Sequence, residues 1–452
     1  MALKQMDALA ALREAAGEVI ETSLCDVQGN WLALVNAEEG KRLAFAANGE
    51  AALSALWKDV ENEADVKDVH VSVMALNANN AALVRRYVKW TAPTACGTKG
   101  ASIGFSDWLG EADAVVAELF GKRQLKPVLV DFTTEDSEAL QRYFVQAVDT
   151  ATWGVLEEGY KEGYGANAAG LKTEEEIVKA LLYGYSMIGF DCSDKIDLGI
   201  EKLSDEAVDK RFEQFNETFR AALHASYLNA EFKVGTSKIT FTENQLHRIV
   251  LEYGEAIMHI QFIYNSYLKN TPWDIDFELD LSKPGKVLTP QEHYLIGNEL
   301  QRNGIKLSSI CLDPLKDSEA VNDNLQLHCE IADTFGYRLS FKNADIAMND
   351  TAAAMKYLKG KVHFKMNNIL WMSAIELVKA LDADLFGKLC AACGCEATAD
   401  AADRALVLGY RKALNPKEES NVAADMKAFL EAHHAEYAAA IKENVAAKLK
   451  NI

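Results

Sequence analysis

Basic residues, cysteines, prolines and long apolar runs are all scarce in this sequence of 452 residues. The 47 lysines and arginines face 67 aspartates and glutamates, a formal charge of -20, so the protein's field repels nucleic acid and anionic membrane surfaces. We expect neither as a partner. No run of about 18 apolar residues occurs, and charges interrupt residues 1–21, where a secretory signal needs an apolar core. We therefore expect a cytoplasmic protein.

Eight cysteines are too few for a disulfide scaffold in a chain of this length. Three of them, Cys390, Cys393 and Cys395, have a spacing found in zinc and iron–sulfur sites. A closed site needs a fourth ligand, and the neighbouring sequence supplies none, so we interpret these three as loop thiols that bind nothing. The 49% of hydrophobic and 25% of charged residues are typical of a globular protein with one large domain or two to three smaller ones.

The chain divides into three parts by its composition and its pattern of apolar residues. Residues 1–92 predict a small α/β unit, with strands over 31–37, 42–47 and 69–76 and a helix over 51–64. Residues 93–395 show short apolar runs that alternate with amphipathic helices, and residues 396–452 are Ala-rich and helical. The strands predicted in the middle part cover 126–132, 186–191, 274–281, 306–313, 337–343 and 361–367.

Strands that alternate with helices predict parallel pairing through right-handed crossovers. A span near 300 residues favours a TIM-like (β/α)8 barrel over a doubly wound sheet. The active site of such a barrel lies at the carboxyl ends of its strands. That rule selects the following polar residues: Asn167, Lys172, Asp191, Asp194, Asp280, Ser282, Lys283, Asp313, Lys342, Asn343, Asp345, His363, Lys365, Asn367 and Asn368.

Glycines and histidines elsewhere have simpler interpretations. The glycines at 159, 163, 165 and 170 match no phosphate-binding motif, and we interpret them as turns between two helices. His433 and His434 are adjacent, so they cannot share one helix face as metal ligands. The histidines at 224, 247, 259, 293 and 328 fall within helical patterns, where a structural role is expected.

Over residues 148–375 the order of segments resembles the tagaturonate epimerase family. The resemblance rests on DTATWGVLEEGYKEGYGANAAGLKT, GYSMIGFDCSD, DIDFELDLSKPGKVLTPQEHYLIGNELQRNGIKL, LHCEIADTFGYRLSFKNAD and KVHFKMNN. It implies a TIM-like barrel that interconverts tagaturonate and fructuronate with a bound divalent metal. The positions that match the family pattern are Trp153, Gly154, Gly163, Gly165, Lys172, Asp191, Ser193, Asp194, His363 and Lys365.

The same resemblance exposes departures at the positions where it implies metal ligands and reacting groups. Carboxylate or imidazole side chains of the family are replaced at Asn167, Ala169, Gly170, Ser282, Lys283 and Lys342–Ala347, an arginine is replaced by Asp313, and a Gly-Asp-Arg run by Thr98–Gly100. A protonated lysine is not a metal ligand, so we expect no metal and no other cofactor. If a metal is present, its ligands come from His363, Asp191, Asp280 and Asp345. Lys283 and Asp313 either form a salt bridge or face solvent separately.

Three functional hypotheses follow. The first is a catalytically silent or repurposed homologue, retained as an oligomer or a partner-binding subunit. The second is a lysine-based enzyme on keto-uronates, in which Lys342 or Lys365 forms a Schiff base if a neighbouring cation lowers its pKa, with Asp191 assisting. The third is the family reaction with a changed ligand set. In each, a small sugar acid is the candidate ligand, and its predicted contacts are Lys172, Asp194, Lys283, Asp313, Asn343 and Asn367.

Overall fold

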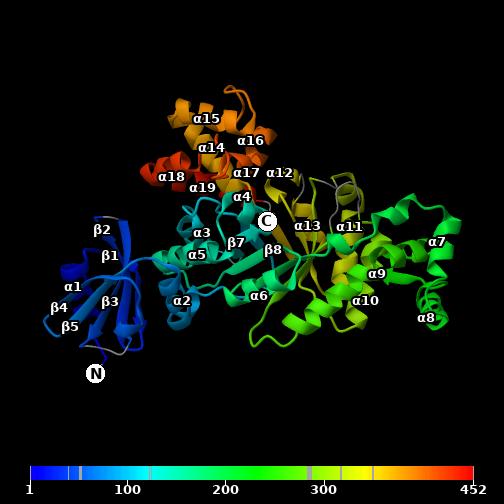
Figure 1. The fold of residues 1–452 in the computed structure, drawn as a ribbon, viewed down its shortest axis with the longest axis horizontal. Coiled ribbons are helices and arrows are strands. Elements are labelled where there is room, and N and C mark those ends of the chain that lie inside the picture. The colour runs from blue at the N-terminus through cyan, green and yellow to red at the C-terminus, as the bar shows by residue number, and fades with distance from the viewer. Residues whose placement is uncertain are drawn as a thin grey trace. The chain divides into compact units, whose positions relative to one another are not determined.

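The computed structural model describes residues 2–38, 40–49, 53–121, 123, 125–281, 288–315, 318–348, 351–450 and 452. Two compact units are present (Figure 1). One comprises residues 1–94, 106–166 and 369–446, and the other residues 95–105, 167–368 and 447–452. No helix in the described part of the chain is long and apolar enough to cross a bilayer.

The first unit begins with a five-stranded antiparallel sheet of order β1-β2-β3-β5-β4. Alternation along β2 sends Leu32 and Leu34 to one face and Ala33 and Val35 to the other, and all four are fully buried. One face packs on helix α1 and the other on α2 and α5, so both faces of the sheet are covered. The strands are β1 (Glu18–Val27), β2 (Asn30–Ala37), β3 (Gly40–Asn48), β4 (Val60–Val66) and β5 (Val69–Met74).

The helix predicted over 51–64 is wrong. Its described part holds a short 3-10 turn over Ser54–Leu56 and the edge strand β4, which pairs with β5. The helical propensity of residues 60–66 is outweighed by strand pairing, because these residues form a ladder with β5, which follows β4 after a short turn.

Eight strands close a barrel in the order β12-β13-β14-β15-β6-β7-β8-β9, as the (β/α)8 prediction requires. Six had been predicted from alternation. The two missed strands are β6 and β8, and β8 contains the glycines 165 and 170 that we had interpreted as turns. The barrel strands are β6 (Ser102–Phe105), β7 (Lys126–Thr133), β8 (Gly165–Leu171), β9 (Met187–Asp191), β12 (Asp276–Asp280), β13 (Ser309–Leu312), β14 (Arg338–Phe341) and β15 (Val362–Met366).

Several helices of the two units begin with a side-chain cap. Helix α9, for example, starts after Thr242, whose hydroxyl and the Gln245 side chain form a reciprocal capping box. Between β9 and β12 the chain inserts α7, α8, α9 and a small hairpin of β10 (Phe232–Val234) and β11 (Ser237–Ile239).

The helices have the following bounds: α1 (Gln5–Ala16), α2 (Ala78–Tyr87), α3 (Asp113–Phe120), α4 (Thr134–Leu140), α5 (Phe144–Glu158), α6 (Glu174–Leu182), α7 (Asp205–Phe212), α8 (Glu217–Tyr227), α9 (Glu243–Ile263), α10 (Pro290–Arg302), α11 (Ser318–Phe335), α12 (Ala344–Ala347), α13 (Thr351–Tyr357), α14 (Ile369–Leu381), α15 (Ala383–Cys393), α16 (Arg404–Leu408), α17 (Tyr410–Ala413), α18 (Ala423–Ala432) and α19 (His434–Leu449).

Candidate functional site

A ring of polar residues runs through the barrel at one level of the parallel ladder. Asp280 on β12 is the register partner of Asp191 on β9 and of Cys311 on β13. The ladder continues at the same level through Ser340 to His363. Side chains alternate between the two faces of a strand, so residues at the same level of neighbouring strands point to the same side. In a closed barrel covered by helices, these polar side chains therefore share the barrel interior.

The deepest ion pair in this interior joins Lys365 of β15 to Glu278 of β12. The Lys365 Nζ lies 2.5 Å from Glu278 Oε1, and their side chains are 3% and 1% exposed. The other carboxylate oxygen, Oε2, accepts a hydrogen bond from Ser309 Oγ at 2.8 Å. Burial opposes the charge on Glu278, but the attraction of Lys365 together with the hydrogen bonds from Lys365 and Ser309 lowers the pKa of this carboxyl. The two groups form an ion pair in which each charge neutralises the other.

Beside this pair lies a buried cluster of Arg338, Ser102 and His363. Arg338 Nη1 donates to Ser102 Oγ at 2.8 Å, and His363 Nδ1 lies 2.9 Å from the same oxygen. His363 Nε2 is buried and has no hydrogen-bond partner among the described residues. Burial lowers the pKa of His363 to about 3, and Lys365 and Arg338 contribute further repulsion. The imidazole is therefore neutral, and its surroundings disfavour any added positive charge.

A second ion pair stands at the carboxyl end of the strands, where Lys342 Nζ donates to Asp280 Oδ2. The side chains of Lys342 and Asp280 are 24% and 11% exposed, so this pair is reachable from solvent whereas the Lys365 pair is not. Burial favours the neutral amine, but the Asp280 carboxylate, with a smaller contribution from Cys311, raises the pKa of Lys342. The depressed pKa that a Schiff-base lysine needs is absent at Lys342.

Lys172, Asp191 and Asp194, which we had predicted to contact substrate or to assist catalysis, lie together, with Lys172 directly after β8, Asp191 at the end of β9 and Asp194 in the turn that follows it. Lys172 Nζ is 3.2 Å from Asp194 Oδ1 and 3.6 Å from Asp191 Oδ2. Asp191 Oδ1 also accepts the backbone N–H of Ser193 at 2.8 Å. Because Lys172 and Asp194 are largely exposed, this cluster forms a solvated rim.

Asp313, Asn343 and Asp345 follow β13 and β14 and form a buried network of turns. Asp313 Oδ1 accepts from Leu315 N at 3.1 Å, and Asn343 Nδ2 lies 3.4 Å from the same oxygen. Both oxygens of Asp345 accept from Asn368, through its backbone N–H at 2.8 Å and its side chain at 3.1 Å. Burial raises the pKa of Asp345. These hydrogen bonds hold the loops at the ends of the strands. The side chains of Asp313, Asn343, Asp345 and Asn368 therefore have mainly structural partners.

The remaining predicted residues are placed as follows. Asn367 directly follows β15 and is half-buried. Ser282 and Lys283 lie outside the described residues, and with them the predicted salt bridge between Lys283 and Asp313.

The barrel residues that the structure describes offer no converging set of ligands for a divalent metal. A catalytic site of this kind needs at least three nitrogen or oxygen ligands converging on one point. Among the residues that the structure describes, His363, Asp191, Asp280 and Asp345 do not form such a group. The carboxylate of Asp280 is engaged by an ammonium group, and so is that of Glu278. A dication bound to Asp280 would have to displace the Lys342 amine.

The sequence analysis missed Glu278, which lies inside β12, and Arg338 and Ser102, which are the first residues of β14 and β6, because it considered only the carboxyl ends of strands. A signal was present, since Asp276, Glu278 and Asp280 alternate with apolar residues along β12, and Arg338, Ser340 and Lys342 do so from β14 into the following turn. In a barrel covered by helices, this period-two polarity predicts a polar interior.

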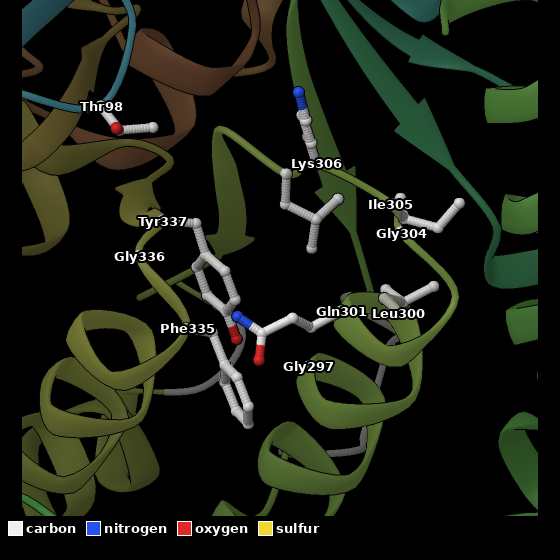
Figure 2. A pocket seen from close by; sticks show the side chains of 11 residues that line it. Thr98, Gly297, Leu300, Gln301, Gly304, Ile305, Lys306, Phe335, Gly336 and Tyr337 are labelled. Atoms are coloured by element: carbon white, nitrogen blue, oxygen red, sulfur yellow. The ribbon is translucent and has the colours of Figure 1, made fainter.

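A cavity of about 410 Å³ lies at the opposite end of the strands. It is lined by residues that immediately precede β13 and β14, including Lys306 and Tyr337, and by Gln301 of α10 (Figure 2). TIM-barrel active sites occur at the other end, so this cavity is separate from the ion pairs described above.

Comparison with known proteins gives one consistent family. The family model for tagaturonate epimerase matches residues 20–441. A tagaturonate/fructuronate epimerase of Thermotoga maritima is 27% identical over 383 residues, which cover 82% of this chain and 78% of that protein. The native crystal structure of fructuronate-tagaturonate epimerase from Cohnella laeviribosi superposes with a TM-score of 0.85 at 26% identity, covering 99% of each chain. Its complex with one glycerol gives 0.86 at 25% identity and the same coverage.

Proposed function

Because the chain belongs to the tagaturonate epimerase family, we propose that it is a divergent member whose barrel binds no divalent metal and is catalytically silent as an epimerase or repurposed. The fold and the family are those of a uronate isomerase, whereas the charges at the centre of the barrel are arranged differently from a metal site. The one observation that carries the proposal is the pairing of Lys342 with Asp280, because Lys342 is a departure from the family pattern whereas Lys365 matches it.

Lys342 supplies the positive charge that the Asp280 carboxylate would otherwise take from a metal ion, and an ammonium group offers no lone pair. Removing a lysine from the buried pair would leave an uncompensated carboxylate, which is costly in a low-dielectric interior. The Lys342–Asp280 pair is therefore a stable alternative to a bound cation, and the neutral His363 Nε2 lies in surroundings that include the cations Lys365 and Arg338 as well as Glu278.

We also propose that neither of the two paired lysines forms a Schiff base. Lys342 is the one of the two paired lysines with an exposed surface, so it is the amine that a ketone could reach. Its raised pKa keeps it protonated near neutral pH, and a protonated amine cannot attack a carbonyl. A sugar acid bound at this end would meet charged side chains that orient it without reacting.

The test is an epimerase assay on the purified full-length protein. The protein is incubated with tagaturonate or fructuronate and with Zn²⁺, Mn²⁺, Ni²⁺ or Co²⁺ in turn, and interconversion is followed by proton NMR. We expect no turnover under conditions in which the Thermotoga maritima enzyme is active as a positive control. Turnover that depends on an added metal, and that is abolished by Asp280→Asn or His363→Gln, would show that the barrel still holds a working metal site.

A further inference from the structure

The helical insertion between β9 and β12 brings two histidines and a glutamate together. His224 lies on α8, and Glu243 and His247 lie on α9. Residues four apart share one helix face, so Glu243 and His247 both point toward α8. One ligand-type atom from each of the three residues lies within 4.8 Å of the others. This cluster, His224–Glu243–His247, is the only such group among the residues that the structure describes.

The two imidazoles meet through their Nε2 atoms, which are 2.9 Å apart. Two histidine nitrogens at about 2.0–2.1 Å from a tetrahedral zinc lie roughly 3.3 Å from one another. The observed separation is within a few tenths of an ångström of this value, and a bound ion would take the place of the proton that one Nε2 donates to the other. Half-buried His224 and exposed Glu243 leave the cluster open to solvent on one side, while His247 is buried.

A carboxylate from a third helix orients the buried histidine. Asp209 of α7 lies with Oδ1 2.7 Å from His247 Nδ1. A carboxylate at this nitrogen favours the tautomer with its proton on Nδ1, which leaves the Nε2 lone pair aimed at the cluster. This is the arrangement by which metal-binding histidines are commonly held.

Phe212 of α7 packs against both imidazole rings. Its ring stacks on His247 with a centroid distance of 3.8 Å and on His224 with 5.6 Å, at interplanar angles of 15° and 6°. The two imidazoles therefore lie nearly in one plane with their Nε2 atoms facing, so binding an ion requires each ring to turn toward it but no change in the backbone of α8 or α9.

A second histidine pair in the same unit shows what a purely structural contact looks like here. His293 and His328 meet through their Nδ1 atoms at 2.8 Å and are both buried. His293 Nε2 is 2.8 Å from the Tyr337 hydroxyl, and no carboxylate faces the pair in the described hydrogen bonds. The pair at His224 and His247 differs by its two carboxylates, Glu243 and Asp209, and by its access to solvent.

We infer that His224, Glu243 and His247 bind a divalent transition metal of the zinc class, with Asp209 positioning His247 and solvent filling the remaining coordination. Two imidazoles and one carboxylate are a ligand set that zinc accepts, whereas Mg²⁺ and Ca²⁺ prefer oxygen ligands alone. The ion would join α8 to α9 and stabilise the insertion by binding only its folded form. This site is remote in sequence from the ion pairs of the barrel and does not depend on their interpretation.

The experiment uses the full-length protein after treatment with EDTA, titrated with ZnCl2 by calorimetry and with CoCl2 by absorption. We expect one ion per chain and d–d bands without an intense thiolate charge-transfer band. His224→Gln and Glu243→Gln should weaken zinc binding at least about tenfold, and Asp209→Asn by roughly 10–100-fold. Zinc should also raise the melting temperature of the unaltered protein and not that of His224→Gln.

The matched control is His434→Gln, which removes an exposed histidine at the start of α19, far along the chain from the cluster. Its zinc affinity should equal that of the unaltered protein. Because His247 is buried and its substitution could impair folding, the partly exposed His224 and exposed Glu243 carry the test. Absence of zinc binding, binding unchanged in these variants, or a thiolate band from cysteine ligands would each overturn the inference.

Discussion

Replacing Lys365 by methionine should strongly destabilise the barrel. Lys365 and Glu278 are almost fully buried, so the variant leaves a carboxylate without its cation inside the protein. Breaking a buried pair from one side costs about 3–5 kcal/mol. For a cooperative unit of 150–250 residues each kcal/mol lowers the melting temperature by about 2–4 °C. We expect a decrease of roughly 6–20 °C in calorimetry.

The pH dependence identifies the cause of this loss. In the unaltered protein the pKa of Glu278 is lowered, so the pair stabilises the fold above the unfolded pKa of about 4.3 and this contribution is lost as pH falls through the folded pKa. In Lys365→Met, burial acts without its opposing cation and raises the pKa of Glu278. The carboxyl then takes up a proton on folding. The deficit of the variant should therefore be largest near pH 8 and should shrink toward pH 5.

A double variant supplies the control. Lys365→Met with Glu278→Gln removes both charges and retains a polar partner for Ser309, so it should recover most of the lost stability and lose the pH dependence. The reasoning is refuted if the single variant melts within about 2 °C of the unaltered protein at pH 8, or if the double variant is no more stable than the single one.

The remaining predictions concern other parts of the chain. Borohydride reduction with tagaturonate or fructuronate, followed by peptide mass spectrometry, should yield no adduct on Lys342, because its amine stays protonated; a stoichiometric adduct would support the lysine mechanism. Burial lowers the pKa of His328 to about 4 and of His363 to about 3, so the unfolded chain binds more protons below about pH 6.5. Melting temperatures should fall between pH 6.5 and 4, and His328→Asn should flatten this slope. Gly297→Ala should cost about 1–3 kcal/mol in denaturant unfolding, since a Cβ there would lie 2.7 Å from an aromatic ring. Gly254→Ala, in a helix with open space around the Cβ position, should instead stabilise by about 0.4–1 kcal/mol, and equal effects of the two substitutions would contradict the packing argument.

The local sequence was informative wherever one residue's environment follows from its neighbours along the chain. Apolar alternation located β7, β9 and β12–β15, because a strand buried between helices and a barrel interior needs such a pattern. It failed for β8, whose run of alanines and glycines resembles a turn until neighbouring strands pair with it. The helix predicted over 51–64 failed for a similar reason, since strand pairing overrode its helical spacing.

The candidate site was predicted only in part. Strand ends pointed to Lys342 and Asp280, which the structure joins, and to Asp313 and Asp345, which instead hold loops. Glu278 was passed over because it lies inside a strand, and the sequence offered no measure of which lysine would face it.

By itself, the sequence determined the family, the succession of strands and helices, and the excess of negative charge, because each depends on residue order or on sums over the chain. Only the tertiary structure decided which charges neutralise one another. Lys365 and Glu278 are 87 positions apart, and His224 and His247 are 23 apart on different helices. Their protonation and ligand chemistry depend on distances of a few ångströms, since electrostatic energy in a buried site changes steeply over that range.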